Sequence, residues 1–122
     1  MEIVPRKSVM IVLTNELPGR EDDFNAWYDH VHMKEVTSVP GFTLARRFSE
    51  PIFYKSPEWM SGDCEGLSPP SRYLAIYDVE GDPAAAAEAL ASASEEWGLS
   101  DSYDRSNVIA WIYSERTVTP PS

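Results

Sequence analysis

The chain contains two histidines, His30 and His32, and both lie in one short stretch, FNAWYDHVHMKEV, at residues 24–36. An imidazole titrates near neutrality, so it can accept and return a proton under physiological conditions. Asp29 lies three residues before His32, and Glu35 lies three residues after it. Residues three apart on a helix are neighbours, so either carboxylate could fix the tautomer of this imidazole and raise its basicity. The stretch is therefore the first candidate for a site of acid–base chemistry.

This stretch belongs to a helix that is predicted to run from about Arg20 to about Ser38. Acidic residues open the helix, where they favour its dipole, and the pattern ends before a Pro-Gly pair. Its apolar side chains recur at spacings of three and four and form one face expected in the core: Phe24, Trp27, Tyr28 and Val31. At about 100° per residue, His32 falls on or near that face, whereas His30 falls on the solvent side.

A histidine near an apolar face also has a simpler explanation, because it can close the edge of a core with one hydrogen bond. Periodicity alone favours that explanation. Glu35 shifts the balance toward chemistry, since a carboxylate on an apolar face is costly unless it is paired or wet. The alternative is that the helix frays before Pro40 and Glu35 reaches water. Trp27 and Tyr28 have the spacing typical of core aromatics, and they are also candidates to contact a substrate or polarise it.

Other candidates lie on the predicted strands and in the long segment between them. Adjacent strand residues point to opposite faces, so one of Arg46 and Arg47 faces the helices and the other faces away. The inward arginine would stabilise an anion or enolate, or it would pair with a helix carboxylate. Trp111 and Tyr113 share one strand face, where they either line a pocket or pack against a second copy. Two further aromatic candidates for substrate binding come from the long segment: Tyr54 and Trp59.

The elements that must position these residues follow a β-α-β, β-α-β order. Strands are predicted at residues 8–14, 42–49, 72–79 and 107–116, and a second helix is predicted from Asp82-Pro83 to Trp97. We expect one α+β domain over residues 1–122, a ferredoxin-like βαββαβ sandwich with a four-stranded antiparallel sheet and two helices on one face. Residues 50–70 are expected to form a long loop that folds over the protein as a lid, and residues 117–122 a frayed tail.

The first and last strands are apolar on both alternating sets of side chains. Two helices cover only one face of the sheet, so the second apolar face needs another cover. The simplest cover is the same face of a second copy, and the sequence therefore predicts a two-fold homodimer.

Composition disfavours several classes of partner. The chain has 122 residues and a formal net charge of −10, which repels nucleic acid and anionic membrane surfaces. Its single cysteine, Cys64, forms no internal disulfide, which fits a reducing cytoplasm. The N-terminal apolar run is too short for a signal peptide or a membrane span. The sequence contains neither a phosphate-binding loop nor a confident set of metal ligands, so no metal and no cofactor are expected.

The stretch PGREDDFNAWYDHVHMKEVTSVPGFTLARRF resembles the EthD-like branch of the dimeric α/β-barrel superfamily. The resemblance rests on an acidic helix start, Phe-Asn-x-Trp-Tyr, a histidine four residues after the tyrosine, and Pro-Gly-Phe before a strand that ends in Arg-Phe. In this chain the matching residues are Phe24, Asn25, Trp27, Tyr28, His32, Pro40, Gly41, Phe42, Arg47 and Phe48. RYLAIYDVEGDP resembles the third strand of that family. Met33-Lys34 departs from it, because the family often has Leu-Pro there.

The resemblance implies a homodimer whose two sheets pack face to face, with a pocket between sheet and helices in each subunit. It implies a small cofactor-independent enzyme, of the cyclase, dehydratase, isomerase or monooxygenase type, that acts on a hydrophobic aromatic or polyketide-like substrate. His32 would be the general acid/base, oriented by Asp29 or Glu35, and Tyr28 or Arg47 would polarise a carbonyl. Two alternatives remain: a non-catalytic accessory dimer, and a protein that binds haem or another small molecule, with haem held by His32.

Overall fold

The structure is a computed structural model, and it describes residues 7–54, 68–117 and 119. The elements in chain order are β1 (Lys7–Thr14), α1 (Glu21–Trp27), η1 (Tyr28–His32), α2 (Met33–Thr37), β2 (Phe42–Phe48), β3 (Tyr73–Glu80), α3 (Pro83–Ser94), η2 (Arg105–Asn107) and β4 (Ile109–Ser114). The first three helical pieces form one continuous helix, so the predicted β-α-β, β-α-β order is confirmed. The central residues of the predicted lid, 55–67, and most of the predicted tail lie outside the described residues.

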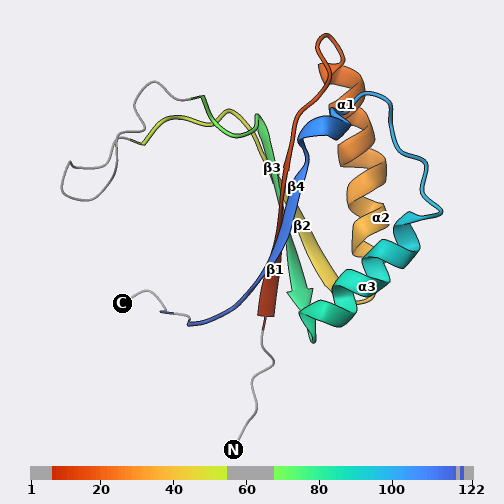
Figure 1. The fold of residues 1–122 in the computed structure, drawn as a ribbon, viewed down its shortest axis with the longest axis vertical. Helices are drawn as coiled ribbons and strands as arrows, with labels where there is room; N and C mark the ends of the chain where they lie inside the picture. Colours follow the sequence, from red (N-terminus) through yellow and green to blue (C-terminus); the bar gives the residue numbers. More distant parts are fainter. Residues whose placement is uncertain (1–6, 55–67, 118, 120–122) are drawn as a thin grey trace, which may run out of the picture.

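The four strands form one antiparallel sheet in the order β2-β3-β1-β4. Figure 1 shows this sheet edge-on, with α1, α2 and α3 all on one side of it. This α+β arrangement of a four-stranded antiparallel sheet and two covering helices is compatible with a ferredoxin-like sandwich. The first strand alternates between side chains that face the helices and side chains that face the opposite, open side, as its burial pattern records.

The core lies between the sheet and the helices. It consists of these buried apolar residues: Met10, Val12, Phe24, Tyr28, Val36, Val39, Phe42, Tyr73, Ala75, Tyr77, Val79 and Ala86. Helix α3 contributes few large side chains to this core, because its sequence PAAAAEALASAS is mostly alanine. It begins as predicted: the Asp82 carboxylate accepts a hydrogen bond from the Ala84 amide, and Pro83 occupies the first turn. The regular helix ends at Ser94, three residues before the predicted end at Trp97.

A bulge in β2 changes the predicted alternation of this strand. The register shifts between Phe42 and Leu44, so Phe42 is 3% exposed on the helix side while Leu44 is 49% exposed on the open side. The simple alternation had placed these two side chains on the same face, which is wrong. An extra residue in one strand is what reverses the faces beyond it. As a result Arg47 lies opposite Ala75, which faces the helices, and Arg46 lies opposite Ile76 on the open side.

Gly41 sits where β2 begins, with a backbone φ of +101°, and a Cβ there would lie 3.1 Å from the Cβ of Ala86. Gly41→Ala is therefore expected to lower the free energy of unfolding by about 1–3 kcal/mol, because it adds crowding against α3 to the strain of a left-handed backbone. Gly81→Ala is the matched control, since its φ is +83° but nothing lies within 4 Å of the new Cβ. Urea denaturation of both variants should show the larger loss at Gly41, and equal losses would rule out the crowding.

Candidate functional site

A π-helical turn, η1, lies in the middle of the long helix and carries both histidines. Within it, the Met33 amide donates to the carbonyl of Tyr28, five residues earlier, so this turn holds one more residue than an α-helical turn. At 100° per residue, side chains four residues apart on an α-helix are rotated by about 40° from each other around the helix axis. The wider π-helical turn offsets this rotation. Phe24, Tyr28 and Val36 are consequently all buried on one face.

The same turn explains one wrong prediction. Val31, which α-helical spacing placed in the core, is 46% exposed. His32 takes the inward position in its place, with a side chain 19% exposed, while His30 is exposed as predicted. π-turns are rare and are frequent at functional sites, so the helix distortion coincides with the residue of chemical interest.

The His32 ring lies among aromatic side chains. It stacks on Trp27 with ring centroids 4.6 Å apart and an interplanar angle of 18°. The rings of Tyr28 and Trp97 meet it edge-on, at 5.0 and 5.8 Å. Trp27 in turn stacks on Tyr103, with ring centroids 5.8 Å apart. The imidazole therefore sits in a mainly apolar setting built from the long helix and from residues that follow α3.

Glu35 supplies the polar contact of His32. Its Oε1 lies 3.4 Å from the Nδ1 of His32, and the carboxylate side chain is 21% exposed. A carboxylate accepts hydrogen bonds, so this contact favours the proton on Nδ1 and leaves a lone pair on Nε2. Nε2 has no hydrogen-bond partner among the residues that the structure describes. The predicted pairing of His32 with Glu35 is present, and the distance is at the long end of the hydrogen-bonding range.

Burial sets the charge state of this histidine. Desolvation lowers the pKa of His32 below its ordinary value, and the nearby Arg47 charge adds to that effect. The hydrogen bond and the charge of Glu35 act in the opposite direction but do not outweigh the burial. The imidazole is therefore neutral at pH 7, as a general base must be.

This lowered pKa makes stability depend on pH. Below the unfolded-state pKa of about 6.5, His32 takes up a proton in the unfolded chain but not in the folded protein. The contribution of His32 to the free energy of unfolding is therefore full above pH 6.5 and is lost as the pH falls toward the folded-state pKa. We expect His32→Gln to lose less stability than the wild type between pH 7 and pH 5, whereas His30→Gln follows the wild type. Urea midpoints across that range measure the difference, and parallel curves for wild type and His32→Gln would contradict it.

Arg47 forms a second group that also contacts the Tyr28 ring. Its Nη1 donates to Asp29 Oδ1 at 2.6 Å, and its side chain is only 11% exposed. The guanidinium lies 4.3 Å from the ring centroid of Tyr28 and 5.1 and 5.4 Å from those of Tyr73 and Phe24. Three aromatic rings thus surround the cation, whose Nη2 is buried without a hydrogen-bond partner among the described residues. Asp29 therefore pairs with Arg47 and not with His32.

Tyr28 joins the two groups rather than presenting its hydroxyl to solvent. It is 2% exposed, and its hydroxyl accepts a hydrogen bond from the Tyr77 hydroxyl at 3.1 Å. Burial raises the pKa of both phenols. The five predicted catalytic residues therefore divide into His32 with Glu35 and Arg47 with Asp29, and both pairs contact the same buried Tyr28 ring.

Two hollows lie on the helix side of the sheet or at its edges, and one of them includes Arg47 and Asp29. A polar hollow of about 320 Å³ is lined by Glu21, Asn25, Asp29, Arg47, Phe48, Ser49 and Tyr73. A mainly apolar hollow of about 580 Å³ between α3, β1 and β4 is lined by Met10, Pro83, Ala84, Ala87, Leu90, Ala91, Ser94, Ala110, Trp111 and Ile112. Neither hollow includes His32 among its lining residues.

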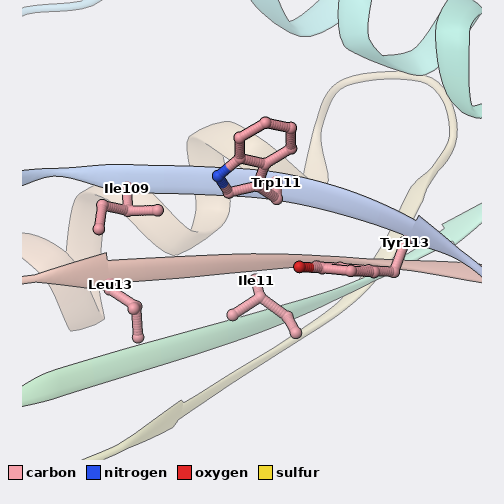
Figure 2. Close-up of a pocket in the computed structure, with 5 residues that line it drawn as sticks. All are labelled: Ile11, Leu13, Ile109, Trp111 and Tyr113. Carbon is pink, nitrogen blue, oxygen red and sulfur yellow. The ribbon is translucent and has the colours of Figure 1, made fainter. Parts of the chain in front are cut away.

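Two of the remaining predicted substrate-binding residues, Trp111 and Tyr113, lie on the open face of the sheet and not beside His32. Figure 2 shows Trp111 and Tyr113 with Ile11, Leu13 and Ile109 around a hollow of about 390 Å³ on the open face of the sheet. The two aromatic side chains are 65% and 60% exposed. Tyr54 is 76% exposed, and Trp59 lies outside the described residues. Among the described residues, Trp27 is the one predicted substrate contact that lies against His32.

Within residues 7–54 and 68–117, no cluster of three or more His, Cys, Asp and Glu side chains is arranged to hold a metal ion. No helix in that same part of the chain has the length and apolar character needed to cross a membrane. Comparisons with protein-family models, with curated proteins and with solved structures found no match to this chain. The EthD-like resemblance therefore stays a prediction.

Proposed function

We propose that the protein is a small cofactor-independent enzyme in which His32 is the general acid/base. One observation carries the proposal: Glu35 contacts Nδ1 of His32, and Nε2 is left without a hydrogen-bond partner among the described residues. A neutral imidazole held in this tautomer takes a proton from a carbon or hydroxyl through Nε2 and returns it elsewhere on the substrate. Proton transfers of this kind serve cyclisation, dehydration and isomerisation, and they also start cofactor-free oxygenation.

The surroundings of His32 support a hydrophobic, aromatic or polyketide-like substrate. The rings of Trp27 and Trp97 lie beside the imidazole, and Tyr103 extends this aromatic surface on Trp27, so an apolar ring of a substrate would find matching contacts there. A dry setting also strengthens the contact between Glu35 and the imidazolium formed during proton transfer. The EthD-like resemblance points to the same substrate class.

A homodimer is the second part of the proposal. The open face of the sheet carries large apolar side chains that are exposed, including Trp111 and Tyr113 at 65% and 60% exposure. Contiguous apolar surface of this kind marks an interaction site on a soluble protein, and a second copy covers it by two-fold symmetry.

A non-catalytic accessory dimer is the competing function. It is favoured by the close packing of the His32 ring against Trp27 and Trp97, which a histidine with a purely structural role would also show. In that case His32 simply fills the space between Trp27 and Trp97 and pairs with Glu35.

Turnover decides between the two functions. Wild type, His32→Gln and His30→Gln would be screened with a panel of aromatic ketones, lactones and linear polyketide-like esters, with and without oxygen. Turnover that depends on His32 supports the enzyme with His32 as its general acid/base. Turnover that survives His32→Gln in a folded dimer excludes His32 from that role, and a wild type that converts no member of the panel favours the accessory dimer. Adding haem tests the third function: a Soret band in wild type that is lost in His32→Gln would show that the protein binds haem through His32, and the enzyme proposal would be replaced by haem binding.

A further inference from the structure

The open face of the sheet is apolar apart from a few charged side chains. Its apolar members come from all four strands: Val9, Ile11, Leu13, Leu44, Phe48, Leu74, Ile76, Ile109, Trp111 and Tyr113. Arg46 on β2 and Asp78 on β3 stand inside this surface, and Lys7 and Glu80 face each other at its end. In Figure 1 the helices lie only on the other side of the sheet. The open face therefore carries one cation and one anion among large apolar side chains.

Arg46 and Asp78 are close but do not pair within the chain. Leu44 lies opposite Asp78, and Arg46 lies opposite Ile76, so the two charged residues are diagonal neighbours. Arg46 turns the other way, with its guanidinium 5.9 Å from the ring centroid of Phe48, which is further from Asp78 along β2. No ion pair joins either residue to another described residue.

We propose that this face binds a second copy of the chain and that Arg46 of each protomer pairs with Asp78 of the partner subunit. The proposal rests on the homodimer proposed above and assigns its orientation: the β2–β3 half of one face lies over the same half of the other. A two-fold axis repeats every contact, so one cation and one anion on a face form two ion pairs across the interface.

The charges choose between a second copy and an unrelated partner. Covering Asp78 with an apolar surface would leave a carboxylate buried and unpaired, which is strongly unfavourable. A second copy brings an arginine to that carboxylate and a carboxylate to its own arginine, so both charges are satisfied by one operation. Pairs of this kind add little net affinity compared with apolar contacts, but they exclude orientations that place like charges together. The apolar residues thus supply affinity, and the pairs select the orientation.

Charge reversal tests the assignment, because the mixed experiment separates pairs between chains from pairs within a chain. Arg46→Glu and Asp78→Lys are made in separate full-length chains, and assembly is followed by sedimentation velocity. Each variant alone places like charges together twice, and we expect its dimer to dissociate about 10²- to 10³-fold more readily than the wild-type dimer. Mixed in equal amounts, the two variants form a heterodimer with both pairs restored, within about tenfold of wild-type affinity.

Two controls change the charge equally elsewhere. Lys34→Glu and Asp22→Lys alter exposed residues of the long helix, on the other side of the sheet, and should leave the wild-type dimer unchanged. A dimeric wild type whose variants do not recover on mixing overturns the Arg46–Asp78 assignment but leaves the dimer standing. A monomeric wild type overturns both. Neither result depends on whether His32 is catalytic, since turnover is measured separately.

Discussion

Phe24→Ala is expected to lower the free energy of unfolding by about 3–5 kcal/mol. Phe24 is 0% exposed, and its ring centroid lies 5.6 Å from that of Tyr28 and 5.1 Å from that of Tyr73. Truncation would remove the ring that these two phenols pack against and would leave a cavity under the Arg47 guanidinium, which lies 5.4 Å from the ring centroid. Guanidinium chloride denaturation measures the loss.

Val31→Ala is the matched control on the same helix. Simple α-helical spacing places Val31 on the face of Phe24, and the π-turn places it outside, where it is 46% exposed. Because the side chain is largely solvated, its truncation should change the free energy of unfolding by no more than about 0.5 kcal/mol. A loss of 1 kcal/mol or more at Val31 would contradict the position of the π-turn and restore the undistorted helix.

The order and type of the elements were predictable because their patterns are local. Strands with β-branched runs, an Asp-Pro helix start and a Pro-Gly stop are read from neighbouring residues. Two features that shift the pattern by one residue were not predictable, the π-turn at Tyr28–His32 and the bulge between Phe42 and Leu44. Each adds one residue to a repeat, and tertiary packing decides where that residue fits.

The candidate site was predicted in part for the same reason. His32 and Glu35 are three residues apart, so helical geometry brings them together without help from the rest of the chain. Trp97 and Tyr103, which contact His32 and Trp27, were not singled out as site residues, because they come from distant parts of the chain. The only available indication was that large aromatics after an alanine-rich helix must find a surface to pack on.

Arg47 shows how a single register decides between two interpretations. The sequence left open which of two adjacent arginines faces the helices, and strand pairing with Ala75 settles it for Arg47. Once inside, the guanidinium is surrounded by aromatic rings and held by Asp29, a helix carboxylate that the sequence analysis had offered to His32. The pairing with Asp29 therefore leaves Glu35 as the carboxylate available to His32.

His32→Gln is expected to lower kcat/KM by about 10²- to 10⁴-fold for whichever panel substrate wild type converts, the usual contribution of a positioned general base. Glutamine keeps a polar side chain of similar length beside Trp27 but cannot exchange a proton near neutrality. His30→Gln is the matched control, since that exposed imidazole lies two residues away and should leave kcat/KM within about twofold. Loss of turnover in both variants would point to a general effect on the helix instead.

The pH dependence of turnover separates chemistry from packing at His32. Burial lowers the pKa of His32 below the ordinary histidine value, so the neutral, basic form already predominates at a lower pH than usual. We therefore expect kcat/KM to rise with pH and to level off before pH 7. Glu35→Gln removes the charge that opposes this burial, which should move the rise in kcat/KM to still lower pH and reduce its plateau, because the imidazolium loses its counter-charge. A purely structural His32 would affect stability across this range while leaving the shape of the kcat/KM profile unchanged.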